Sequence, residues 1–137
     1  MPPVINQHAE FPAPPKEVFE LYLDSRKHAA ATGAPARLSR KIGGSWHAHG
    51  GMIGGRNLLI APGRMIVQSW RAKFWKKEDI SVLVLEFTRT RGGARVDLIH
   101  VDVPYYDQKG VRGGWPKYYW KPWKKYLADR SRKKKNR

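Results

Sequence analysis

The sequence predicts an α+β fold in which a curved antiparallel sheet of about seven strands wraps around a long C-terminal helix, with short helices after the first strand. Short segments with strand-like alternation follow one another from Ala36 to Val103, and turns rich in glycine separate them. Apolar residues recur at helical spacing on both sides of this region. Strands grouped apart from helices are typical of a sheet that packs its helices against one face.

The predicted elements begin with a strand and two short helices. Residues 4–11, VINQHAEF, form the strand. Residues 12–23, PAPPKEVFELYL, form the first helix, whose prolines are tolerated because the first helical N–H groups have no partner anyway. Residues 24–33, DSRKHAAATG, form the second helix, which ends at Gly33.

Six strands and a long helix complete the chain. The strands are ARLSRKI (36–42), SWHAHG (45–50), GRNLLIA (55–61), MIVQSWRAKF (65–74), ISVLVLEFTR (80–89) and ARVDLIHVDV (94–103). From Gly113 the segment GGWPKYYWKPWKKYLADR returns to helical spacing. Pro122 removes one hydrogen bond of this helix, so we expect a kink near Tyr118.

The composition is that of a globular chain with a strong basic excess. A chain of 137 residues is most simply one domain, and the absence of cysteine excludes disulfides and thiolate metal sites. The first residues lack the pattern of a signal peptide, and no apolar run reaches the roughly 20 residues that span a bilayer. We therefore expect a soluble cytoplasmic protein with no membrane span.

The charge is unevenly placed along the chain. Lys and Arg number 27 against 11 acidic residues, a formal net charge of +16. After a single domain at 1–128, the sequence predicts a basic, disordered tail at 129–137. Such a tail attracts polyanions, so it could bind a nucleic-acid partner.

The segment 50–57, GGMIGGRN, approaches the spacing of a phosphate-binding loop, but a predicted strand follows it instead of the helix that such a loop requires. We therefore expect turns and close backbone approach from these glycines. His47 and His49 are two apart on a predicted strand and would both face outward, because Trp46 is the better core residue. Two ligands do not complete a metal site, so we expect no bound metal and no cofactor.

Catalytic signals are weak. His100 and Asp102 could form an orienting pair for acid–base chemistry, but the chain offers no evident nucleophile. Tyr105, Tyr106 and Gln68 could instead hydrogen-bond a polar group of a ligand. The sequence thus favours a binding protein over an enzyme, with no catalytic residue assigned.

Four segments of the chain carry a family resemblance over roughly residues 4–128. Its markers are a double glycine before Trp46, the Trp70–Arg71 pair, a strand with Leu98 and His100, and Gly114–Trp115 at the start of the last helix. In this order they resemble the activator of heat-shock-protein-90 ATPase homologue family of the START-like, helix-grip (SRPBCC) superfamily. The resemblance implies a cavity between the concave face of the sheet and the last helix.

Alternation of polar and apolar residues indicates which side chains face this cavity. The candidate ligand-binding residues are Trp46, Gln68, Trp70, Leu83, Leu85, Leu98, His100, Trp115, Tyr119 and Trp123. An apolar or aromatic small molecule is the expected ligand. Three alternatives stay open: the same side chains fill the cavity, the chain is a co-chaperone-like or other protein-binding module, or it is a basic nucleic-acid-associated protein.

Overall fold

The computed structural model describes residues 2–135, with side chains through Lys133. The elements are β1 (Ile5–Phe11), α1 (Pro15–Leu23), α2 (Ser25–Thr32), β2 (Arg37–Leu38), β3 (Ser45–Ala48), η1 (His49–Gly51), β4 (Ile53–Ala61), β5 (Met65–Ala72), β6 (Ser81–Thr90), β7 (Gly93–Val101), η2 (Tyr105–Asp107), α3 (Gln108–Trp115), η3 (Pro116–Trp120) and α4 (Lys121–Lys135). The strands form one antiparallel sheet in the order β1-β7-β6-β5-β4-β3-β2.

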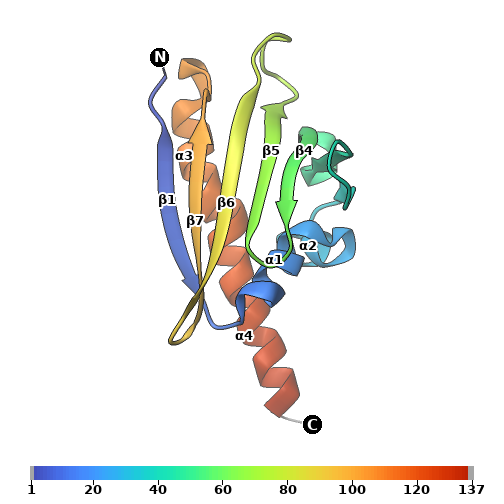
Figure 1. Ribbon diagram of the computed structural model, residues 1–137, viewed down its shortest axis with the longest axis vertical. Helices are drawn as coiled ribbons and strands as arrows, with labels where there is room; N and C mark the ends of the chain where they lie inside the picture. The colour runs from blue at the N-terminus through green and yellow to red at the C-terminus, as the bar shows by residue number, and fades with distance from the viewer. Residues whose placement is uncertain (1, 136–137) are drawn as a thin grey trace.

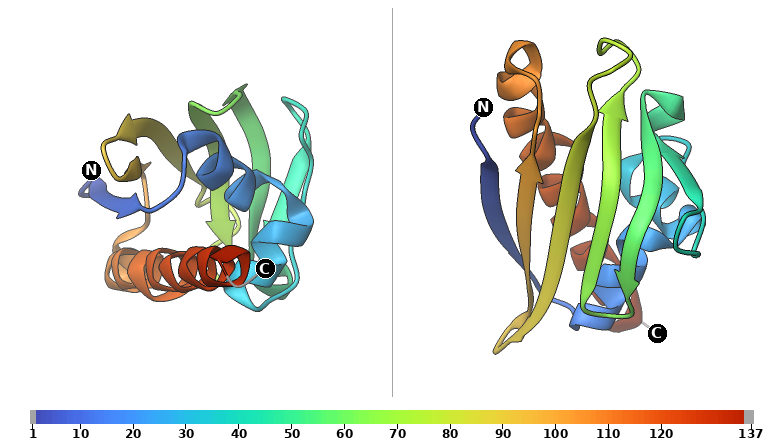
Figure 2. Two further views of the ribbon diagram at one scale, coloured as in Figure 1. Left: turned by 90° about the horizontal axis from the view of Figure 1, so that it is seen from below. Right: turned by 45° about the horizontal axis from the view of Figure 1, so that its top comes forward.

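The helices lie on one side of this sheet. The continuous helix α3–η3–α4 runs across the concave face, and α1 and α2 pack near its lower end (Figures 1 and 2). The opposite face of the sheet carries no helix in either figure. The predicted helix-grip fold is therefore confirmed.

Alternation along the strands sorts side chains as predicted. β5 alternates between half-buried and buried residues, and its buried members are Ile66, Gln68, Trp70 and Ala72. The same pattern buries Leu83, Leu85 and Phe87 of β6 and Val96, Leu98 and His100 of β7. The inward-facing set of the sheet is thus confirmed.

The second predicted strand, 36–42, is much shorter than expected, because the buried side-chain amide of Asn57 forms hydrogen bonds there in place of strand pairing. Only Arg37 and Leu38 pair with β3. The Asn57 side chain donates to the carbonyls of Ser39 (2.7 Å) and Lys41 (3.0 Å), and the N–H of Gly43 donates to the Asn57 carbonyl at 2.7 Å. These bonds hold residues 39–44 in a turn.

The glycines of residues 50–55 form a turn and allow close backbone approach, as predicted. Gly50 and Gly51 have φ values of 67° and 92°, in the left-handed region that favours glycine. A Cβ on Gly55 would overlap the backbone carbonyl of Ser69, so β4 and β5 approach too closely for a side chain. Since a strand begins at Ile53, no helix follows these glycines to bind phosphate.

The C-terminal helix starts at Gln108, earlier than the predicted Gly113, and it contains one wide turn. Over Pro116–Trp120 the hydrogen bonds span five residues, and the N–H of Lys121 donates to the carbonyl of Pro116. The indoles of Trp115 and Trp120 consequently stack, with ring centres 5.6 Å apart and an interplanar angle of 26°. This change in helix geometry falls at the position where Pro122 is predicted to disturb the helix.

The basic segment after residue 128 continues this helix to Lys135, so in the structure residues 129–135 are helical, whereas a disordered tail was expected. Arginine, lysine and alanine are good helix formers, and Asp129 pairs with Arg132 at 2.7 Å. Residues 136 and 137 lie outside the described residues. Within residues 2–135, no helix is both long and apolar enough to cross a membrane.

We predict that deleting residues 129–137 leaves the fold and its stability almost unchanged. No described side chain after Leu127 is buried, so this end of α4 contributes little apolar burial. Thermal unfolding followed by circular dichroism should give melting temperatures within about 2 °C for the full and shortened chains. A fall of 10 °C would show that the end of α4 stabilises the body of the domain.

Candidate functional site

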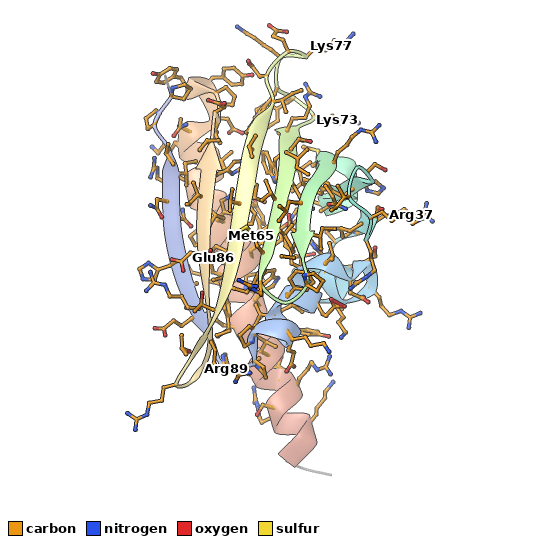
Figure 3. The ribbon with its side chains drawn as sticks, viewed as in Figure 1. Arg37, Met65, Lys73, Lys77, Glu86 and Arg89 are labelled. Carbon is orange, nitrogen blue, oxygen red and sulfur yellow. The ribbon has the colours of Figure 1, made fainter. Side chains whose placement is uncertain are left out.

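A cavity of about 380 Å³ opens at one end of the sheet, between β4, β5 and the helical segment α3–η3. This is the end where the β5–β6 loop projects, with Lys73 and Lys77 marking it in Figure 3. The lining residues are His49, Met52, Ile53, Trp70, Ala72, Phe74, Asp107, Gly110, Val111, Gly114, Trp115, Tyr118 and Tyr119. Most of them present apolar or aromatic surface.

Small residues create this space. Ala72 ends the inward row of β5, and Gly110 and Gly114 of α3 line the cavity from the helix side. Farther along the helix, Tyr119, Trp123 and Leu127 are large and buried against the sheet. The helix and the sheet are therefore in full contact at one end and separated by open space at the other.

Hydrogen bonds fix one wall of the cavity through His100. The indole of Trp115 donates to His100 Nδ1 at 3.3 Å, His100 Nε2 lies 2.8 Å from Ser81 Oγ, and Ser81 donates to the Trp70 carbonyl at 2.6 Å. Because the Ser81 proton goes to Trp70, His100 must donate from Nε2 and accept at Nδ1. Burial lowers the pKa of His100 to about 3, which agrees with this neutral form.

A second network fixes Tyr119. Its hydroxyl donates to His28 Nε2 at 3.0 Å, and His28 Nδ1 donates to the Tyr22 carbonyl at 2.7 Å. Burial lowers the pKa of His28 to about 4 and raises that of Tyr119, so both stay neutral. The Tyr22 hydroxyl in turn donates to Gln68 at 2.6 Å, and the Gln68 amide donates to Asn57 at 2.9 Å.

The β5–β6 loop is tied down at the mouth of the cavity. The indole of Trp75 donates to Asp107 at 2.7 Å, and the hydroxyl of Tyr106 donates to Asp79 at 2.6 Å. The N–H of Lys76 also donates to the Tyr106 oxygen at 3.0 Å. These bonds join the loop to η2 and hold Phe74 at the edge of the cavity.

His49 does not face outward, contrary to the prediction from the sequence. The strand β3 ends at Ala48, and His49 turns to a φ of 51°, so it does not share the outward orientation of the exposed His47. Its half-buried ring packs against Tyr118 and Tyr119, with centres 5.6 and 5.3 Å apart. Its Nε2 is buried without a hydrogen-bond partner, as is Nε1 of Trp70.

The structure divides the predicted ligand-binding residues into two groups. Trp70, Trp115 and Tyr119 line the cavity. The others are buried elsewhere in the core, away from the lining: Trp46, Gln68, Leu83, Leu85, Leu98, His100 and Trp123. Gln68 already donates and accepts within the core, which leaves it poorly placed as a ligand handle.

Alternation and helical spacing in the sequence do not indicate at which end of the sheet the space lies. His49, Asp107 and the glycines of α3 were not among the candidate ligand-binding residues. Glycine inside a helix costs about 1 kcal/mol relative to alanine, so Gly110 and Gly114 would have indicated a packing or functional reason only if the helix had been predicted to begin at Gln108.

The side chains considered for acid–base chemistry do not come together. Both ring nitrogens of His100 bond to Ser81 and Trp115, so the pairing with Asp102 considered from the sequence does not form, and Asp102 is exposed with a φ of 62°. Among the side chains of residues 2–133, no serine, threonine or lysine lines the cavity. Among the residues that the structure describes, no three histidine, aspartate or glutamate side chains gather as a metal site would require.

Comparison with known proteins supports one family. The sequence model described as "Activator of Hsp90 ATPase homolog 1-like protein" matches residues 12–128. The chain is 28% identical over 105 residues to the Homo sapiens activator of 90 kDa heat shock protein ATPase homolog 1, covering 77% of this chain and 31% of that protein. It is 27% identical over 118 residues to an uncharacterised Schizosaccharomyces pombe protein, covering 86% and 35% of the two chains. It thus spans about a third of the length of these curated relatives.

A solved structure shows the same fold. An HSP90 activator from Plasmodium falciparum, PFC0360w, superposes with a TM-score of 0.77 at 22% identity, covering 85% of this chain and 89% of that one.

We predict that the buried histidines make stability fall on acidification. Folding lowers the pKa of His100 to about 3 and of His28 to about 4, against an ordinary value of 6.5. Below pH 6.5 the unfolded chain therefore binds protons that the folded chain excludes, and stability is lost as the pH falls towards the folded pKa. Each histidine should lower the free energy of unfolding by about 2 kcal/mol between pH 7 and pH 5.

Urea unfolding at both pH values measures this effect. His100→Gln should show a drop about 2 kcal/mol smaller than the wild type. Ser81→Ala is the matched control, because it weakens the same network but keeps the imidazole, and its drop should persist. Equal drops in wild type and His100→Gln would contradict the assignment.

Proposed function

The chain belongs to the Activator of Hsp90 ATPase homolog 1-like family, and on this basis we propose that it is a binding module that holds an apolar or aromatic small molecule in the cavity between β4, β5 and α3. The observation that carries the proposal is the open space of about 380 Å³ beside rings that are fixed in place. Small-molecule sites have volumes of roughly 300–1,000 Å³ and mostly apolar walls.

The fixed walls favour binding because their side chains lose little conformational entropy when a ligand enters. Of the lining residues, Trp115 is held by His100, Tyr119 by His28, and Asp107 by Trp75. Immobilising a mobile side chain on binding costs roughly 0.5–1.5 kcal/mol, and this cost is avoided for rings that are already held. Each Å² of apolar surface removed from water then contributes about 25 cal/mol.

We predict that Gly114→Leu abolishes small-molecule binding without unfolding the chain. A Cβ at Gly114 meets only the Tyr118 ring, at 3.6 Å and beyond, so a leucine side chain fits there and fills the cavity. Leucine is also a better helix former than glycine, so the melting temperature should hold or rise. A larger side chain at Leu98, another candidate ligand-binding residue, would not test the cavity, because Leu98 lies in the filled core.

Gly113→Leu is the matched control, since Gly113 is the exposed neighbour and its Cβ would meet nothing within 4 Å. Native mass spectrometry of the purified chain and tryptophan fluorescence with a panel of aromatic and lipid-like compounds are the measurements. The wild type and Gly113→Leu should respond and Gly114→Leu should not. If the Gly114→Leu variant binds as well as the wild type, the ligand binds outside this cavity.

The outer face of the sheet supports a second candidate, a co-chaperone-like function. Four apolar residues lie side by side across it: Leu59 pairs with Val67, Val67 with Val84, and Val84 with Ile99. Leu59 and Ile99 are 42% and 40% exposed. Met65 and Glu86, which mark this face in Figure 3, form the next row along. The names of the relatives indicate a partner of the 90 kDa heat shock protein class.

Under this second candidate, adding the chain to a purified 90 kDa heat shock protein should raise its rate of ATP hydrolysis. The double change Leu59→Ser and Ile99→Ser removes apolar contact area, so about fivefold more protein should be needed for half the effect. Ile42→Ser is the control, because Ile42 is 66% exposed but belongs to the 39–44 turn and not to this row of paired residues. An unchanged hydrolysis rate with the wild-type chain would remove this candidate.

A further inference from the structure

We propose that the cavity takes an uncharged, flat aromatic compound with one hydrogen-bonding group, and that His49 is the residue that recognises this group. The inference rests on the small-molecule function proposed above. It adds the charge, the shape and the polar contact of the ligand.

The shape follows from the walls. Trp70, Trp115, Tyr118 and Tyr119 place aromatic rings around the cavity, and Phe74 lies at its edge. Aromatic rings pack on one another edge to face or in offset stacks, so a flat ring system can meet several of these walls at once. Trp115 and Tyr119 already lie 4.7 Å apart and tilted by 36°, and a ligand ring would extend that arrangement.

The charge follows from which residues are missing from the lining. The chain carries 27 lysines and arginines, yet among the side chains that the structure describes none of these lines the cavity, and the one formal charge of the lining is Asp107. An anionic ligand would leave water for a lining whose one charge is a carboxylate, which is unfavourable, because Lys117, with its Nζ 5.2 Å from the centre of the Tyr118 ring, is exposed to solvent and outside the lining. A cationic ligand would be repelled by a chain of net charge +16, and Asp107 already accepts a hydrogen bond from Trp75.

The polar contact follows from the hydrogen-bond inventory of the walls. The indole N–H of Trp115 already donates to His100, and the hydroxyl of Tyr119 already donates to His28. Two ring nitrogens on lining residues stay without a partner, Nε2 of His49 and Nε1 of Trp70. A buried polar atom left unpaired costs about 1–3 kcal/mol, and a ligand group that bonds to it recovers this free energy.

His49 is the better recognition residue of the two. Trp70 is a donor only and is packed between Trp75 and His100, with ring centres 5.3 and 4.9 Å away. Burial lowers the pKa of His49, so its imidazole is neutral and can either donate or accept. Its φ of 51° is uncommon for a residue other than glycine, and such strained conformations cluster at ligand sites.

Four naphthalene compounds of equal ring size test the inference: naphthalene, 2-naphthol, 2-naphthoate and 2-naphthylmethylammonium, titrated at pH 7.5 by fluorescence. In the wild type, 2-naphthol should bind roughly tenfold tighter than naphthalene, a difference of about 1.4 kcal/mol. The two charged compounds should bind more weakly than naphthalene. Tighter binding of either charged compound than of 2-naphthol would overturn the inferred charge.

Variants of His49 test the contact. His49→Phe keeps an aromatic ring but has no polar atom, and His49→Asn tolerates the left-handed backbone but is shorter, so in both the advantage of 2-naphthol should disappear. His47→Phe, at the exposed neighbour on β3, should keep it. A tenfold advantage that survives in His49→Phe and His49→Asn would overturn the role of His49.

The outcomes also separate this inference from the proposed function. Equal binding of naphthalene and 2-naphthol to the wild type, lost in Gly114→Leu, would leave the small-molecule function standing and refute the recognition by His49. No binding of any of the four compounds, together with no retained small molecule in native mass spectrometry, would refute both.

Discussion

The hydrogen-bonded chain that runs from Trp115 through His100 and Ser81 to the Trp70 carbonyl determines how the C-terminal helix meets the sheet. It joins α3 to β7, β6 and β5, and all four of its residues are buried. Each donor and acceptor in it has one role, so the helix cannot slide or rotate without leaving a buried polar group unpaired. The cavity wall depends on the same bonds, since Trp115 belongs to both.

Much of the fold could be predicted because its physical causes are local. One polar and one apolar face per strand determine which side chains point inward, and this was enough for β5, β6 and β7. The length of β2 could not be predicted, because Asn57, far along the chain, supplies the hydrogen bonds that end it. The start of α3 was missed because its glycines disfavour a helix, and tertiary packing overrides that preference.

The site was predicted less completely for a geometric reason. Alternation and helical spacing identify the side of an element that a residue faces, but not how closely the opposite element approaches at that level. Leu98 and Trp123 face inward as expected, yet they meet other side chains and fill the space. Trp70 and Trp115 face inward at the end where Ala72 and Gly114 leave room. His49 could not be placed, because its orientation depends on a left-handed backbone conformation that alternation cannot foresee.

The wide turn at Pro116–Trp120 lets this helix hold one residue more than a regular helix would. Each residue of an α-helix advances its angular phase by about 100°. Because the wide turn absorbs its extra residue locally, Trp115 before it and Trp123 and Leu127 after it all stay buried. A single deletion should therefore be tolerated best within Pro116–Trp120, where it would restore a regular turn, and worst between Trp123 and Leu127, where it would rotate Leu127 away from the sheet.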